Sequence, residues 1–113
     1  MHVRRATLPL FIAIALATSL AIAGEAKTPL GKWMKPNMGT PMAGQDFATL
    51  QKSLSLVASK VPSGSYGDWA KLAQGGADAA GKQDPSGVKA SCKGCHDKYK
   101  QQYITDHLSD PFP

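Results

Sequence analysis

Apolar residues recur at helical spacing along much of the chain, and the clearest stripe lies between Asp46 and Val61. Its apolar positions follow the i, i+3, i+4, i+7 pattern of an amphipathic helix, with polar residues on the opposite side. The stripe consists of Phe47, Leu50, Leu54, Val57, Ala58 and Val61. Asp46 is a suitable N-cap, and the proline at position 62 ends the pattern. We therefore predict a helix over residues 46–61.

A second apolar stripe follows, from Tyr66 to Ala80, and Gly81 ends it. Ser65 and Asp68 have the spacing of a capping box, which predicts that the helix starts at residue 65. The pair of glycines at positions 75 and 76 weakens such a helix by about 1 kcal/mol each relative to alanine. Close packing against a neighbouring helix is the expected reason for them.

The longest predicted helix begins at Asp84, because an acidic N-cap followed by Pro85 is a typical helix start. Its apolar pattern continues without a break until Pro111.

The segment from Leu30 to Ala43 is less regular. Its large apolar residues keep a helical period, but two prolines interrupt it. We expect Pro36 to open a short helix just after Met34, and Pro41 to bend or end it. Short loops make successive helices antiparallel. The sequence therefore predicts an all-α, antiparallel four-helix bundle with a short, irregular first helix.

The first 23 residues are typical of a cleavable signal peptide. Arg4 and Arg5 precede an apolar run from Leu8 to Ala23, and its last three residues have the small-x-small pattern that signal peptidase recognises. The run is shorter than the ~20 residues of a membrane-spanning helix. We expect residues 24–113 to be a single exported domain, with membrane contact limited to the signal peptide or weak surface association.

The charge pattern limits the function. With Arg4 and Arg5 removed, 11 lysines face 8 acidic residues, a net charge of +3. The two signs are interspersed, which is typical of a solvated surface and argues against nucleic-acid binding. A domain this small buries a marginal core and often depends on a bound cofactor. We do not expect it to be an enzyme.

The strongest chemical signal is Cys92-Lys93-Gly94-Cys95-His96. The pattern C-x-x-C-H marks covalent attachment of haem c, in which both thiols bind one porphyrin and the histidine ligates its iron. Three alternatives compete. A redox dithiol normally lies near a strand–helix unit, zinc needs a fourth ligand, and a disulfide across one helical turn would be strained. We predict haem attachment at Cys92 and Cys95 and iron ligation by His96.

The sequence does not decide which residue is the second axial ligand of the iron. Only 17 residues follow His96 and none is methionine, so a methionine ligand has to lie upstream. Met34 is the first choice and Met38 the substitute, and iron without a protein ligand on that side stays a third option. His107 lies about 16 Å along the helix from His96, too far to reach the same iron, and is expected at the helix C-terminus.

The segment Cys92-Lys93-Gly94-Cys95-His96-Asp97-Lys98-Tyr99-Lys100 on a last helix resembles the class II cytochromes c, which include cytochrome c prime and cytochrome c-556. The segment Trp33-Met34-Lys35-Pro36-Asn37-Met38 resembles the Met-Lys segment of their low-spin members, and this resemblance assigns the distal ligand to Met34. The family usually has arginine at the positions of Leu30 and Lys100. The haem propionates are therefore expected to bind other cations, and Lys32, Lys35 and Lys100 are the candidates.

The expected function is single-electron transfer between periplasmic redox partners, which touch the protein transiently. Two alternatives remain open. Five-coordinate iron would bind nitric oxide or carbon monoxide, as in the cytochrome c prime branch, and a haem subunit would serve a larger redox complex. Lys93, Lys98 and Lys100 are either a docking face for an acidic partner or a solvated helix face. A homodimer also stays open.

Overall fold

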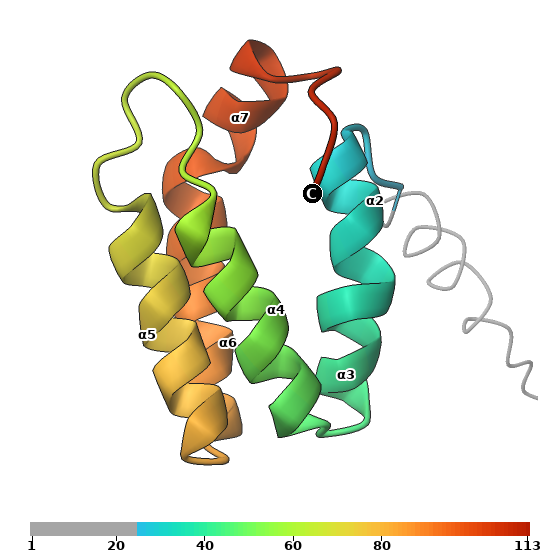
Figure 1. The fold of residues 1–113 in the computed structure, drawn as a ribbon, viewed down its shortest axis with the longest axis vertical. Coiled ribbons are helices and arrows are strands. Elements are labelled where there is room, and N and C mark those ends of the chain that lie inside the picture. The colour runs from blue at the N-terminus through green and yellow to red at the C-terminus, as the bar shows by residue number, and fades with distance from the viewer. Residues whose placement is uncertain (1–24) are drawn as a thin grey trace, which may run out of the picture.

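The computed structural model describes residues 25–113, so the predicted signal peptide lies outside the described residues. The described chain is an all-α bundle of four helical runs, and consecutive runs point in opposite directions (Figure 1). Two of the runs are regular α-helices, and the first and last runs each contain a π-helical segment. The elements are α2 (Pro29–Met34), η1 (Lys35–Gly39), α3 (Thr40–Ala43), α4 (Phe47–Ser59), α5 (Trp69–Gly81), α6 (Pro85–Cys95), η2 (His96–Lys100) and α7 (Gln101–Asp106).

The helix predicted at 46–61 is confirmed as α4, but it ends earlier, at Ser59, and the predicted stripe residue Val61 lies beyond it and is exposed. Asp46 is its N-cap, and one carboxylate oxygen accepts a hydrogen bond from the Thr49 backbone N–H at 3.2 Å. The predicted stripe faces inward, because Leu50, Leu54 and Val57 are all buried. A polar N-cap and one apolar face are therefore sufficient to define this element.

The third helix starts later than predicted. The capping box at Ser65 is wrong, since α5 begins at Trp69 and Asp68 is its N-cap. Asp68 makes no side-chain cap bond, because its carboxylate pairs with Lys98 and its backbone N–H donates to the Tyr99 hydroxyl at 2.7 Å. Contacts with the last helix thus override the local capping signal. The end at Gly81 is confirmed.

The first helix is irregular, as predicted, but it is not short. It begins at Pro29, where the Thr28 hydroxyl caps the Gly31 N–H at 3.0 Å, and it continues through both later prolines to Ala43. Neither Pro36 nor Pro41 opens or ends it. Instead the turn between them widens into the π-helical η1, in which the Thr40 N–H bonds to the Lys35 carbonyl.

The physical reason for the π segment is the spacing of the prolines. Pro41 has no N–H, and its ring would collide with the carbonyl four residues earlier in a regular α-helix. A wider turn relieves that collision. The Asn37 side-chain amide donates to the Trp33 carbonyl at 2.8 Å, so it supplies one hydrogen bond inside the disturbed region.

The last helical run begins as predicted. Asp84 is the N-cap and accepts from the Gly87 N–H at 3.1 Å, with Pro85 in the first turn. The run passes through η2 and ends with α7 at Asp106, before the predicted end at Pro111. The final residues instead form an extended segment that turns back toward the start of α2 (Figure 1).

The packing divides the bundle into two parts. α5 lies between α4 and α6 and packs closely along both. The first helical run packs on α4, and none of its segments packs extensively against α6, η2 or α7. The residues described include no strand and no helix that is long and apolar enough to cross a membrane.

Small residues explain the close approach of α5 to its neighbours. A Cβ atom at Gly76 would lie 2.7 Å from the Ser91 Oγ of α6 and 3.2 Å from the Leu54 Cδ1 of α4. The predicted packing reason for this glycine is therefore confirmed. Gly75 has open space around it, so only its neighbour has this role.

Candidate functional site

Cys92 and Cys95 lie near the C-terminal end of α6, one helical turn apart, and both pack half-buried against the core. Their neighbours in sequence fix the orientation of the helix. The Ser91 hydroxyl donates to the Leu72 carbonyl of α5, and Gly94 approaches the Leu72 side chain. Because successive residues of an α-helix are about 100° apart, residues three apart are about 60° from each other, so the two thiols share a face that adjoins the face in contact with α5.

Both cysteines are free, and no disulfide joins them. Burial raises the pKa of the Cys92 thiol, and burial together with the nearby Cys92 raises the pKa of Cys95. Reactive redox dithiols need the opposite shift, because the thiolate is the nucleophile. These thiols are therefore held in their protonated form at neutral pH.

His96 directly follows the second cysteine and is the first residue of η2. The residue is exposed, yet partial burial of the ring lowers its pKa, and the positive charge of Lys100 lowers it further against a small opposing effect of Asp97. At neutral pH the imidazole is consequently neutral, which is the form that binds a metal ion.

The candidate distal ligands lie on the first helical run. Met34 is half-buried at the junction between α2 and η1, whereas Met38, inside η1, is buried at 9 % exposure and belongs to the core. Both axial candidates preferred from the sequence, Met34 and His96, therefore stand where an α-helix passes into a π-helix. Such segments occur frequently at functional sites. The paired prolines are a sequence signal for η1, but η2 has none that we can identify.

The lysines near the motif differ in their pairing. Lys93 forms an ion pair with Asp97 at 2.6 Å, and Lys98 pairs with Asp68. Two of the three proposed docking cations therefore have acidic partners within the molecule, which favours the solvated-face interpretation for them. Lys100 acts electrostatically on His96.

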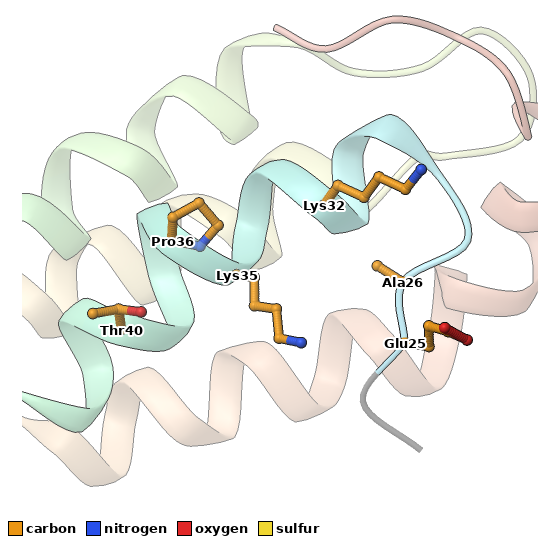
Figure 2. A pocket seen from close by; sticks show the side chains of 6 residues that line it. All are labelled: Glu25, Ala26, Lys32, Lys35, Pro36 and Thr40. Carbon is orange, nitrogen blue, oxygen red and sulfur yellow. The ribbon is translucent and has the colours of Figure 1, made fainter. Parts of the chain in front are cut away.

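A groove of about 550 Å³ adjoins the first helical run. Lys32, Lys35, Pro36 and Thr40 line it from the helix, and Glu25 and Ala26 line it from the preceding segment. Figure 2 shows the Lys35 side chain extending from its helix toward the last helical run. Two of the three cations expected to bind propionates thus lie at one groove, while Lys100 lies on η2.

The aromatic residues form two groups. Trp69, Tyr99 and Tyr103 pack with Tyr66 in one buried cluster, with ring centroids 5.3–6.5 Å apart. Trp69 is buried, and its Nε1–H donates to the Val57 carbonyl at 2.9 Å, so this residue is part of the core. Trp33 instead packs edge-to-face on Phe112 at 4.8 Å. Tyr66 was predicted at the start of the second helical stripe but lies in the loop before α5, and Phe112, to which the sequence pattern assigned no role, lies after α7.

The structure thus brings three of the four predicted site residues together. Cys92, Cys95 and His96 lie on one continuous helical run, and Met34 lies on a different run that packs on α4. Within residues 25–113, no group of three histidine, cysteine or acidic side chains is arranged to hold a metal ion by itself.

Comparison with known proteins gives no match, either to a protein-family model, to a curated protein or to a solved structure.

Proposed function

We propose that this protein carries one covalently attached haem c and transfers single electrons between redox partners in the periplasm. The observation that carries the proposal is the arrangement of the motif. Two unpaired, half-buried thiols share a face of α6, and a neutral imidazole follows them on the same helical run. Each residue has the chemical form that haem attachment requires.

The residues of the motif have separate tasks. Cys92 and Cys95 would each form a thioether with the porphyrin, and the two bonds would fix its orientation relative to α6. His96 would donate a nitrogen lone pair to the iron, and the nearby charge of Lys100 favours the neutral ring. When bound, haem supplies the exchange of one electron between ferrous and ferric iron. The chain itself would position the ligands and cover the buried part of the ring.

The competing chemistries find less support. A thiol oxidoreductase would need a cysteine with a lowered pKa, and burial raises the pKa of both cysteines here. A zinc site would need a fourth ligand beside two cysteines and one histidine. Haem attachment uses these three side chains in full.

The arrangement of the helices also supports the proposal. A bundle whose first and last helices packed closely would leave little space between them, but here the first helical run packs on α4. Lys32 and Lys35 line the groove beside that run, and their ammonium groups would suit the two carboxylates of a porphyrin.

The same packing keeps a second function open, in which haem iron binds nitric oxide or carbon monoxide. Met34 is only half-buried and Met38 is held in the core, so neither is fixed as a ligand by its surroundings. If neither reaches the iron, the sixth position is free for a gas.

The direct test is the mass and colour of the purified protein from a bacterial strain that matures c-type cytochromes. We expect a red product whose mass exceeds that of the processed polypeptide by one porphyrin, even after denaturation. The double variant Cys92→Ser and Cys95→Ser should lose this mass. Lys93→Ser is the matched control, since it changes an exposed residue between the cysteines and should retain it. A colourless wild-type product with no added mass would contradict the proposal.

A further inference from the structure

The last seven residues form a strap that closes one end of the bundle. After α7 ends at Asp106, residues 107–113 turn back toward the start of α2 (Figure 1). The strap reaches the first helical run through Phe112, whose ring packs on Trp33 at 4.8 Å. Since the first and last helical runs do not pack extensively against each other, the contact between Phe112 and Trp33 connects them through the strap.

The strap covers a hollow of about 340 Å³. Its walls come from the first helix, the loop between α4 and α5, the aromatic cluster and the strap itself. They include Leu30, Val61, Trp69, Tyr103 and Phe112. Movement of the strap would therefore expose this hollow to solvent.

One side chain holds the strap at its origin. His107 caps α7, and its side chain is only 10 % exposed. Its Nδ1 lies 2.6 Å from a carboxylate oxygen of Asp110, within the strap, and its Nε2 lies 3.0 Å from the Ser63 carbonyl in the α4–α5 loop. Three segments of the chain therefore meet at one imidazole ring.

Both partners of this ring are hydrogen-bond acceptors. A neutral imidazole has a single N–H and can donate to only one of them, whereas the imidazolium donates to both. The geometry therefore requires a protonated His107. The Asp110 carboxylate and then the Ser63 carbonyl raise the pKa of His107 against the opposing effect of burial, and the charge of Asp106 on α7 adds to the rise.

The other groups around the ring are mostly uncharged. Tyr66 and Tyr103 lie against it with centroids 5.6 and 5.2 Å away. The Tyr66 hydroxyl donates to Asp106, and burial raises the pKa of Tyr66 to about 12, so it stays protonated over the working range. Lys60 lines the same hollow and is the one cation among its lining residues besides His107.

We propose that the strap is a pH-operated cover, which the doubly hydrogen-bonded imidazolium of His107 holds closed against Trp33 and which opens when that ring loses its proton. A histidine with a raised pKa stabilises the closed form fully below the ordinary value of about 6.5. This stabilisation is lost as the pH rises through the raised value. The cover is therefore closed below about pH 6.5 and opens as the pH rises above it, independently of whether haem is bound.

The test follows the strap and the ring separately in the purified protein. Imidazole ¹⁵N shifts report the protonation of His107, and ¹⁹F spectra of protein labelled with 5-fluorotryptophan report the surroundings of Trp33, assigned with Trp33→Phe. We expect both signals to change in one common transition above pH 6.5. Any haem is kept reduced, and a colourless product would not affect the measurement.

Variants make the outcome decisive. Asp110→Asn should move the common transition to lower pH, and His107→Gln should abolish the pH dependence of the Trp33 signal. Phe112→Ala should leave His107 titrating while the Trp33 signal no longer follows. Leu108→Ala, at an exposed neighbouring position, is the control and should behave as wild type. A Trp33 signal that stays constant while His107 titrates, or that still follows pH without Phe112, would overturn the proposal.

Discussion

The two parts of the bundle are built in different ways. α5 approaches α4 and α6 closely on small residues, and a Cβ at Gly76 would collide with both neighbours. The first helical run carries three prolines and a π-helical segment, and it packs on α4 and on the C-terminal strap. The three-helix part is therefore stabilised by its own packing, whereas the first run has room on the side of the last helix.

This difference indicates what a cofactor would contribute. Packing between α4, α5 and α6 fixes the residues of the three-helix part whether or not a porphyrin is present. The first run makes fewer contacts with the rest of the bundle, so its position is less firmly fixed. The proposed haem would join the two parts, since His96 lies on one and Met34 and Met38 lie on the other. Variants in the two parts should consequently respond differently to haem.

The largest effect is expected from the two methionines. Met34→Ala should convert a six-coordinate optical spectrum, with sharp split visible bands, into a broad high-spin spectrum that reacts at once with carbon monoxide. Met38→Ala should keep the six-coordinate spectrum but lower the free energy of unfolding by about 2–5 kcal/mol, because Met38 is buried. Visible spectra and urea unfolding of both variants provide the measurement.

The reverse pair of results would move the ligand to Met38. A wild-type protein that is high-spin and binds carbon monoxide would instead favour the gas-binding function. Met42→Ala is a suitable control, since Met42 is half-buried on the same helical run and is not a preferred ligand candidate.

The second prediction compares two neighbouring glycines. Gly76→Ala places a Cβ 2.7 Å from Ser91 Oγ, and we expect it to lower the free energy of unfolding by about 1–3 kcal/mol. Gly75→Ala meets open space and should raise it by about 0.5–1 kcal/mol, because alanine favours the helix. Urea unfolding monitored by circular dichroism measures both, and equal effects of the two variants would refute the close packing.

The sequence was informative where local signals and packing agree. Asp46 and Asp84 cap the helices that their positions predict, because each carboxylate accepts a hydrogen bond from a backbone N–H in the first turn of its helix. At Ser65 the same signal failed, since the carboxylate of Asp68 is engaged by Lys98. Lys98 is 30 residues away from Asp68 in the chain, so a local motif cannot predict this contact.

The candidate site shows the same division. Cys92, Cys95 and His96 are predictable because their relationship is set by one helix. The π-helical turns after Met34 and at His96 depend on how the backbone accommodates its surroundings. The prolines of the first run are a sequence signal for η1, but the sequence has no such signal for η2. The strap was missed because residues 107–113 have no periodic pattern, and its anchoring contacts to Ser63 and Trp33 are distant in the sequence.

The smallest predicted effect comes from the helix caps, and it tests most directly whether the two parts of the bundle unfold separately. Thr28 caps the first helical run and Asp84 caps the last, each by accepting one backbone hydrogen bond. Replacing either by alanine removes about 1 kcal/mol of capping energy. We expect Asp84→Ala to lower the global free energy of unfolding by this amount, because α6 is part of the three-helix packing.

Thr28→Ala should act locally as long as no haem is bound. In the Cys92→Ser and Cys95→Ser background, it should increase hydrogen exchange within residues 29–43 several-fold and leave the global unfolding midpoint nearly unchanged, because the first run can open by itself. In the haem-containing protein the same substitution should lower the global midpoint, since a ligand on the first run would couple it to the last helix. An equal loss of global stability in both backgrounds would mean that the bundle unfolds as one unit without haem.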